Sequence, residues 1–246
     1  QYDLLHGYNM ELLPAVGALS YINDVPSVAH LNSYTFINKR GIGMDPRGRE
    51  KIYNDFVRPL TGPITQKAIS NIDRLIALSE SVYTIYDESG IDTRMNIVTN
   101  MIDPAVTPDS VSYNTTDSKN ILYVGSLENH KGVRYLVEAA SLFPEITITI
   151  VGSGSKRSAL ESLVEENGVG SRVTFEGQVP YEEVSDYYDR SDIFVHPGTW
   201  PEPLNRTVLE AMQHGLAVVA TDRGGPRDVM RDSSLIVEPK NPQALA

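Results

Sequence analysis

The most informative stretch of the chain is residues 193–212, which read IFVHPGTWPEPLNRTVLEAM. Its first four residues predict a buried strand that ends at His196, and the Pro- and Gly-rich residues behind them predict a loop. Apolar residues at helical spacing then predict a helix over 207–214. A strand, a loop and a helix in this order are typical of a parallel sheet with helices on its faces.

The same alternation covers residues 119–246. The predicted strands are 120–124, 146–151, 172–175, 193–196, 217–220 and 235–237. The predicted helices are 132–142, 156–167, 181–190, 207–214 and 226–231, and residues 241–246 predict the start of another. The strand at 146–151 is apolar on both faces, which is expected of a strand buried in a parallel sheet. This part of the chain is therefore expected to form one doubly wound α/β domain with right-handed crossovers.

Residues 1–104 carry a less regular pattern of the same kind. Helices are predicted at 10–21, 59–70 and 80–88, and strands at 27–31, 75–78 and 96–98. Residues 38–54 contain three Gly and predict a long irregular loop or short helices. The polar, aperiodic segment that follows residue 104 predicts a linker. We therefore expect a domain at 1–104, a linker at 105–118 and a second domain at 119–246.

Composition excludes several classes of function. The 21 Lys and Arg against 32 Asp and Glu give a net charge of −11, which argues against nucleic acid or an anionic membrane as the main ligand. The sequence has no cysteine, which excludes disulfides and Cys-zinc sites and fits a reducing compartment such as the cytoplasm. No apolar run is long enough to span a bilayer. The chain starts without Met and stops at the start of a helix, so we expect a piece of a longer protein.

Two carboxylates flank the start of the helix predicted in the stretch quoted above. Glu202 precedes the helix, and Glu210 lies eight residues later on it. Free backbone N–H groups at a helix start, together with the helix dipole, favour an anion. Carboxylates beside such a site are suited to accept hydrogen bonds from sugar and ribose hydroxyls. The alternative is that Glu202 is only a charge at the helix N-terminus and Glu210 a solvated surface residue.

This stretch resembles the E-x7-E signature of family 4 glycosyltransferases, which are retaining, nucleotide-sugar-dependent enzymes of the GT-B fold. The family motif reads close to E-P-F-G-x-x-x-x-E-A-M, followed by G-x-P-V-V-A, and this chain has EPLNRTVLEAM followed by GLAVVA. The resemblance implies that Glu202 holds hydroxyls of the donor sugar and Glu210 those of the ribose. Leu204 and Asn205 replace the usual Phe and Gly, and with Arg206 they would supply backbone N–H groups to the donor.

A second match to the family lies at 123–132, YVGSLENHKG, against the pattern G-R-L-x-x-x-K-G. Gly125, Ser126 and Lys131 occupy its Gly, Arg and Lys positions. In the family the Arg and the Lys face the donor diphosphate, so the resemblance assigns Lys131 to phosphate. Ser126 removes one cation, and Arg206 is the first candidate to replace it, with His130 as the second.

Three further loops follow predicted strands. Gly224 and Gly225 precede a helix, where paired glycines allow the backbone to approach a ligand, and the family has a matching loop against the donor. Val179 stands where the family's backbone meets the nucleobase. The G-x-G at 152–154 lacks the third Gly of a dinucleotide fingerprint, with Arg157 in its place. We interpret it as a structural turn, the role of a similar G-x-G in the family.

In the N-terminal part, the resemblance points to His30 and Asn32. Family members have a His after the corresponding strand, in a V-x-x-H-D/N pattern. Here 27–33, SVAHLNS, aligns best with Asn32 at the His position and His30 two residues earlier. Period-two alternation points both side chains the same way, so either could serve as the catalytic residue of this part. The alternative is a strand-end His whose hydrogen bonds are satisfied by a neighbouring helix.

The whole resemblance implies an α/β protein of the GT-B type: two Rossmann-like, doubly wound parallel-sheet domains facing across a cleft, the N-terminal one incomplete. The implied reaction moves a sugar from a nucleoside-diphosphate sugar to an acceptor hydroxyl with retention of anomeric configuration. Glu202 and Lys131 are the expected catalytic residues of the C-terminal domain. The sequence has no D-x-D pair, so neither a metal nor a cofactor besides the donor is expected.

The acceptor implied by the resemblance is a glycan, a lipid-linked sugar or a small molecule, and no nucleic acid is expected as a partner. Peripheral membrane contact is expected through a segment before Gln1. Three alternatives remain. An epimerase or phosphorylase of the same fold would share the donor site, although the E-x7-E spacing disfavours it. A dinucleotide oxidoreductase would need a complete G-x-G-x-x-G. A non-catalytic nucleotide-sugar-binding fragment is open because Ser126 replaces the family Arg.

Overall fold

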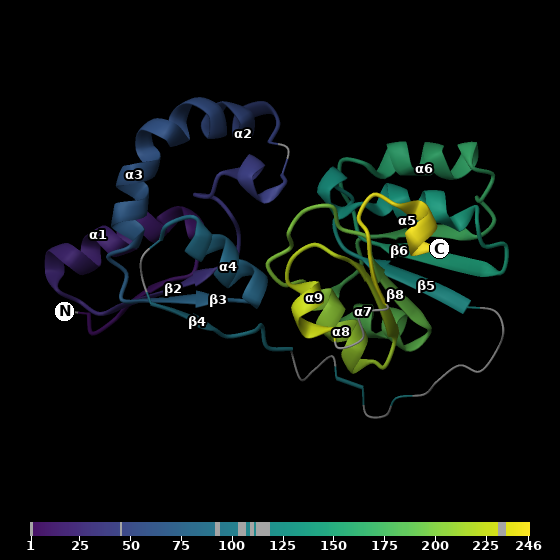
Figure 1. Cartoon of the computed structure of the whole chain (residues 1–246). Coiled ribbons are helices and arrows are strands. Elements are labelled where there is room, and N and C mark those ends of the chain that lie inside the picture. Colours follow the sequence, from purple (N-terminus) through teal and green to yellow (C-terminus); the bar gives the residue numbers. More distant parts are fainter. Residues whose placement is uncertain are drawn as a thin grey trace. The chain divides into compact units, whose positions relative to one another are not determined.

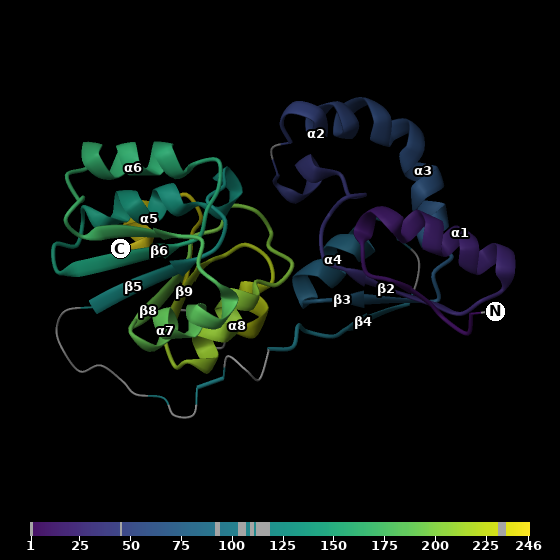
Figure 2. The same ribbon diagram turned by 180° about the vertical axis from the view of Figure 1, so that it is seen from behind.

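The structure is a computed structural model of the chain, and it describes residues 2–44, 46–91, 94–102, 107–108, 111, 119–230 and 235–246. It divides into two compact units, Gln1–Asn100 and Met101–Ala246. Each unit is built around one parallel sheet (Figures 1 and 2). Most of the predicted linker, 105–118, lies outside the described residues. Within the described ranges, no helix combines the length and the apolarity that crossing a bilayer requires.

The N-terminal unit contains a four-stranded parallel sheet in the order β1-β2-β3-β4. Its strands are β1 (Leu5–Gly7), β2 (Ser27–Leu31), β3 (Arg74–Ala77) and β4 (Met95–Ile97). Its helical segments are η1 (Met10–Leu12), α1 (Leu13–Asn23), η2 (Lys39–Ile42), α2 (Gly48–Ile52), the π-helical η3 (Tyr53–Val57), α3 (Arg58–Ile69) and α4 (Glu80–Glu88). The prediction missed β1, because three residues are too few to show a period of two.

The C-terminal unit contains a six-stranded parallel sheet in the order β10-β9-β8-β5-β6-β7. Its strands are β5 (Lys119–Val124), β6 (Ile146–Val151), β7 (Val173–Gly177), β8 (Ile193–His196), β9 (Ala217–Thr221) and β10 (Ile236–Val237). Its helical segments are η5 (Asn129–Lys131), α5 (Val133–Ala140), α6 (Arg157–Glu166), η6 (Tyr181–Glu183), α7 (Val184–Asp189), α8 (Arg206–Gln213), α9 (Pro226–Val229) and α10 (Pro242–Leu245). Counted along the chain from β5, the order is sixth, fifth, fourth, first, second, third, which is the doubly wound Rossmann arrangement.

Successive side chains of β5 belong alternately to two separate apolar clusters. Ile121 and Tyr123 belong to a cluster with side chains of α5 and α6. Leu122 belongs to a second cluster with side chains of α7 and α8. Figures 1 and 2 show these two pairs of helices on opposite faces of the sheet. The sheet is therefore buried on both sides, which explains why its strands are apolar on both faces.

The predicted helices and strands are confirmed to within two residues at each end, where the structure describes them. The predicted helix at 10–21 begins as the short segment η1 and continues as α1. The segment 38–54, predicted as a loop or short helices, holds η2 and α2. Its last two residues already belong to η3, which runs without a break into α3. The predicted α/β class with parallel sheets of the GT-B type is confirmed.

Helices α1 and α3 are in close contact at Gly17. A Cβ atom added there would lie 1.8 Å from the backbone oxygen of Ala68, so the contact requires glycine. We expect Gly17→Ala to lower the free energy of unfolding by about 1–3 kcal/mol, because the helices would have to move apart. Gly41→Ala, in the short segment η2 of the same unit, is the matched control. Gly41 is exposed, and its Cβ would meet nothing nearer than Asn38 Cβ at 3.8 Å, so stability should stay within about 0.5 kcal/mol of wild type. Urea titrations that place both variants at wild-type stability would contradict this view of the α1–α3 contact.

Candidate functional site

The strands β5 and β8 are neighbours at which the C-terminal sheet reverses its winding direction. In sheets of this kind, ligands bind beyond the carboxyl ends of the strands at the reversal point. The chain beyond β5 leads to Lys131, and the chain beyond β8 leads to Glu202. The topology alone therefore selects these two loops as the candidate site.

Hydrogen bonds to a backbone oxygen hold the two loops together. The backbone N–H of Thr199 donates to the oxygen of His130 over 2.8 Å, and the Thr199 hydroxyl reaches the same oxygen over 3.2 Å. Gly132 has a φ of +71°, and a Cβ there would lie 1.9 Å from the Pro197 oxygen. Only glycine satisfies both conditions, so the Gly after Lys131 allows the loops to touch.

Lys131 and Glu202 form an ion pair across these loops. The Nζ–Oε2 distance is 2.8 Å, and the side chains are only 16% and 11% exposed. Trp200 donates from Nε1 to the same carboxylate oxygen, and its ring lies beneath the ammonium, 5.8 Å from ring centroid to Nζ. Burial disfavours ionisation of Glu202, but Lys131, His196 and these hydrogen bonds together hold its pKa below the usual value. Glu202 is therefore an ionised, largely buried carboxylate.

The backbone of Glu202 is fixed from the other side by the Gly-Gly loop after β9. Gly225 donates its N–H to the Glu202 oxygen over 2.7 Å, and Gly224 forms an isolated β-bridge with Glu202. Gly224 has a φ of +77°, and a Cβ there would lie 2.2 Å from the Glu202 oxygen. The paired glycines were predicted to approach a ligand, which stays a prediction; in the structure their close backbone approach is to Glu202.

Glu210 is buried on α8 and receives two phenolic hydrogen bonds. The hydroxyl of Tyr181 donates to Oε1 over 3.0 Å, and that of Tyr188 donates to Oε2 over 2.9 Å. Glu210 is 4% exposed, so the alternative of a solvated surface residue is wrong. Burial, followed by the charge and hydrogen bond of Glu210, raises the pKa of Tyr188 well above its usual value, so this phenol stays a donor. The second carboxylate is therefore placed to accept hydrogen bonds from hydroxyl groups.

The start of α8 is organised by Asn205 and His196. Asn205 Oδ1 caps the helix by accepting from the N–H of Thr207 over 3.1 Å and from its hydroxyl over 2.7 Å. Asn205 Nδ2 lies 3.0 Å from Nδ1 of His196, at the end of β8. Because an amide nitrogen only donates, Nδ1 accepts and the proton of the neutral ring is on Nε2. Within the described part of the chain, that Nε2 is buried without a hydrogen-bond partner.

The other residues predicted to bind the donor nucleotide sugar differ in burial and in their contacts. Gly125 donates its backbone N–H to the Val151 oxygen over 3.0 Å, which ties the start of its loop to β6. Leu204 is buried, and Val179 packs against the apolar cluster of α7 and α8. Ser126 and Arg206 are exposed. The structure therefore places a polar but uncharged side chain where the family Arg would stand, and a cation at the first residue of α8.

The G-x-G loop at 152–154 has a packing role. A Cβ on Gly152 would lie 1.9 Å from the Gly125 oxygen, and one on Gly154 would lie 2.5 Å from the Leu127 oxygen. The backbone N–H of Leu127 also donates to the Ser153 oxygen over 2.9 Å. The prediction of a structural turn fits this geometry, because the loop braces the chain between β5 and Lys131.

The two candidates of the N-terminal unit lie together against Tyr8. The ring of His30 lies 5.5 Å from that of Tyr8 and 5.1 Å from that of His6, between centroids. Asn32 donates from Nδ2 to the Tyr8 oxygen over 3.0 Å. Burial and the neighbouring His6 lower the pKa of His30, which favours its neutral form at neutral pH. The structure thus brings His30 and Asn32 into one cluster at the carboxyl ends of β1 and β2.

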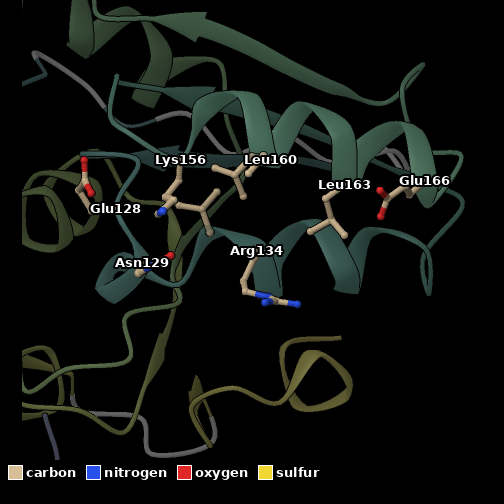
Figure 3. Close-up of a pocket in the computed structure, with 9 residues that line it drawn as sticks. Glu128, Asn129, Arg134, Lys156, Leu160, Leu163 and Glu166 are labelled. Carbon is tan, nitrogen blue, oxygen red and sulfur yellow. The ribbon is translucent and has the colours of Figure 1, made fainter. Parts of the chain in front are cut away.

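A separate groove runs between α5 and α6 (Figure 3). Leu160 and Leu163 line it from α6, Arg134 lines it from α5, and Glu128 and Lys156 lie toward one end. Neither Glu202 nor Glu210 lines it. The groove lies between two helices on one face of the sheet, and only its end at Glu128 and Asn129 reaches the loop after β5, so we do not assign it to the candidate site.

Sequence reasoning missed the aromatic partners of both carboxylates. Trp200 stands only two residues before Glu202, and Tyr181 and Tyr188 are seven residues apart, which is two helical turns. That spacing places two phenols on one side of a helical segment just after β7. The pattern was readable, but without the sheet order nothing showed that this segment lies beside α8.

The C-terminal unit is thus a Rossmann-like α/β unit with two buried carboxylates at the carboxyl ends of its strands. Residues 109–246 match the family described as Glycosyl transferases group 1. This match covers more than half of the chain, and the protein belongs to that family.

Individual relatives agree with this assignment. The chain is 36% identical over 135 residues to "Uncharacterized glycosyltransferase MJ1607" of Methanocaldococcus jannaschii, covering 53% of this chain and 34% of the relative. It is 26% identical over 188 residues to a phosphatidylinositol N-acetylglucosaminyltransferase polypeptide of Arabidopsis thaliana, covering 74% of this chain and 42% of the relative. The chain thus spans well under half the length of these curated relatives.

Solved structures share the fold over nearly the whole chain. Sucrose-phosphate synthase from Thermosynechococcus elongatus superposes with a TM-score of 0.78 at 23% identity, over 99% of this chain and 62% of that one. Anabaena HepE in complex with UDP-glucose superposes with a TM-score of 0.76 at 21% identity, over 100% of this chain and 67% of that one. These likenesses establish the GT-B fold of the chain.

The buried ring of His196 makes stability depend on pH. Burial is the main cause that lowers its pKa to about 4 from the usual 6.5, and Lys131 adds to this while Glu202 opposes it. Between these two pH values the unfolded chain binds a proton that the folded chain does not, so stability falls as the pH drops from 6.5 to 4. We expect His196→Asn, which keeps an acceptor near Asn205, to reduce the loss of unfolding free energy between pH 7 and pH 4 by about 3 kcal/mol. Urea titrations at both pH values measure this difference, and equal losses in both proteins would contradict a neutral buried His196.

Proposed function

We propose that this site binds a nucleoside-diphosphate sugar and that the complete protein transfers the sugar to an acceptor hydroxyl with retention of anomeric configuration. The observation that carries the proposal is the pair of buried carboxylates on either side of the α8 start, one of them paired with Lys131. An anion site at a helix start, a cation beside it and two hydroxyl acceptors match the parts of a nucleotide sugar.

The contacts of each carboxylate support its role. Glu210 already accepts from two hydroxyl groups, the same type of donor that a ribose offers. The side-chain contacts of Glu202 described above both use Oε2, and among the described residues Oε1 makes no hydrogen bond. That oxygen is the natural acceptor for a hydroxyl of the donor sugar.

The diphosphate would be held by Lys131 and by the N–H groups at the start of α8, from Leu204 to Arg206. A phosphate oxygen near Lys131 would share the ammonium with Glu202, whose charge would otherwise repel the phosphate. The departing diphosphate carries negative charge, and fixed N–H groups and an ammonium stabilise such a charge without reorganising. We propose that this arrangement works without a metal ion, in keeping with the sequence, which has no D-x-D pair.

The sugar is proposed to be a hexose, and UDP-glucose is the first donor to test, because HepE was solved in complex with it. The acceptor stays open between a glycan, a lipid-linked sugar and a small molecule. Two relatives carry names that include phosphatidylinositol and lipopolysaccharide core, and these acceptor classes deserve the first assays. We propose a cytoplasmic site of action, where nucleotide sugars are available to the enzyme.

Product analysis tests the transferase proposal against its alternatives. We expect consumption of a nucleotide sugar to require an acceptor, the product linkage to have the donor's anomeric configuration by NMR, and the rate to be unchanged by EDTA. An inverted linkage would contradict retention. An isomerised nucleotide sugar without an acceptor would indicate the epimerase alternative, and binding without turnover by the full-length protein would indicate the non-catalytic one.

Binding measurements test the residue roles separately. A thermal-shift panel of UDP-, GDP- and ADP-sugars first identifies the base, because a ligand of the folded state raises the melting temperature.

Calorimetry with variants then tests the two charged residues. Glu210→Gln should lower the affinity for both the nucleoside and its diphosphate by roughly 10- to 100-fold, because a hydrogen bond to a charged group is lost. Lys131→Ala should weaken the diphosphate much more than the nucleoside. Glu138→Gln, which changes a carboxylate paired with Arg134 on the surface of α5, is the matched control and should change neither. Equal losses of both ligands in Lys131→Ala would remove Lys131 from the phosphate.

A further inference from the structure

Glu202 and Glu210 differ in how their hydrogen bonds are distributed over the two carboxylate oxygens. Glu210 accepts one phenolic hydrogen bond on each oxygen. On Glu202, the ammonium of Lys131 and the indole N–H of Trp200 both donate to Oε2, over 2.8 and 2.5 Å. The buried carboxylate of Glu202 therefore has two donors on one oxygen, and its other oxygen is left for a donor that the described part of the chain does not supply.

The two donors of Glu202 differ in what they can fix. The ammonium of Lys131 carries three N–H donors at the end of a flexible chain, and it attracts a carboxylate from any direction. The indole of Trp200 has a single N–H in the plane of a rigid ring, so its hydrogen bond has one direction. Trp200 therefore sets the orientation of the carboxylate, and Lys131 mainly supplies the opposite charge.

The ring of Trp200 is itself held by the loop that follows β5. Its centroid lies 5.0 Å from that of the His130 ring, at an interplanar angle of 67°, which is an edge-to-face contact. The ammonium of Lys131 lies over its face, 5.8 Å from the centroid. The preceding residue, Thr199, donates its backbone N–H to the His130 oxygen. The indole thus keeps its position relative to both Lys131 and Glu202.

We propose that Trp200 is a positioning residue for the sugar of the donor, because its N–H keeps Oε2 of Glu202 in place while Lys131 serves the diphosphate. This inference rests on the proposed function. A phosphate beside Lys131 would take over part of the ammonium, and the ion pair alone would then no longer fix the carboxylate. The single N–H of the indole is already used by Glu202, so it stays with the carboxylate and leaves Oε1 directed to a hydroxyl of the sugar.

Packing of the indole alone does not account for its contact with Glu202. A buried indole N–H requires an acceptor, but a backbone oxygen or a water molecule would serve. Burying a carboxylate costs far more free energy than burying an acceptor of that kind. The contact is therefore explained by what the indole does for the carboxylate, and not by what the carboxylate does for the indole.

The indole N–H can be observed directly, because Trp200 is the only tryptophan of the chain and gives one indole resonance in a 1H–15N spectrum. We expect this N–H to exchange slowly with solvent in the free 246-residue chain. It should stay equally protected when the chain is saturated with the nucleotide sugar selected from the panel of UDP-, GDP- and ADP-sugars. Fast exchange in the complex would mean that the indole has left Glu202, and it would overturn the proposal without the use of any variant.

Replacing only the N–H tests the effect on binding. Production in a tryptophan auxotroph fed with L-3-benzothienylalanine puts a sulfur atom in place of the indole N–H at position 200 alone and keeps the shape of the ring. By calorimetry, we expect the affinity for the nucleotide sugar to fall by roughly tenfold, because a hydrogen bond to a charged group is lost. The affinity for the matching nucleoside diphosphate should fall by less than about threefold, because that ligand has no sugar for Glu202 to hold. Trp200→Phe should show the same difference between the two ligands.

Tyr187→Phe is the matched control, because it also removes an aromatic donor from a carboxylate of the same unit. The Tyr187 hydroxyl donates to Oε2 of Glu176 over 3.3 Å at an exposed position. This variant should bind both ligands like wild type, and unfolding curves should show every protein folded. Equal losses of both ligands after replacement of the indole N–H, or no loss of either, would overturn the role of Trp200 and leave the proposed function intact. A wild-type chain that binds no nucleotide sugar of the panel would instead overturn the proposed function, and this inference with it.

Discussion

The ion pair between Lys131 and Glu202 connects the loop after β5 with the loop after β8. The C-terminal sheet reverses its winding direction between these two strands. An exposed pair of this type contributes little to stability. This one is largely shielded, and removing one partner of a buried pair typically costs about 3–5 kcal/mol because the other charge is left uncompensated. The pair therefore fixes the loops after β5 and β8 relative to each other before any ligand arrives. Preorganisation of this kind is what a site for a diphosphate requires, since its polar groups need not rearrange at the moment of reaction.

Backbone contacts make this pair possible. Gly132 lies against the Pro197 oxygen and Gly224 against the Glu202 oxygen, each at a distance that no side chain allows. Both have positive φ values, so any substitution would add backbone strain to a steric clash. The same rule explains Gly152, which holds the loop that leads to Lys131. The chemistry of the site therefore depends on residues that carry no functional group, because they bring three loops close enough for one ion pair.

Most of the fold could be predicted because its signals are local. The strand 193–196 and the helix 80–88 were predicted with their correct bounds. The signals used for them, which are runs of apolar residues, helix caps and helical periodicity, depend only on residues close together in the sequence. The choice of Glu202 and Glu210 followed from spacing and resemblance. Their partners did not, because Tyr181 and Tyr188 meet Glu210 only through the order of strands β7, β6, β5 and β8. The three-residue strand β1 is set by pairing with β2, which a single sequence does not display.

The partners of Glu210 change the energetics of nucleotide binding. Each of its oxygens accepts one phenolic hydrogen bond, and a carboxylate oxygen can accept a second, so a ribose hydroxyl can bind beside the phenol of Tyr181 without displacing it. The two phenols hold the carboxylate in place before a nucleotide arrives, so a ribose would meet an acceptor that need not reorganise. Glu210 would thus contribute to affinity through the nucleoside, whereas Lys131 and the start of α8 would contribute through the diphosphate.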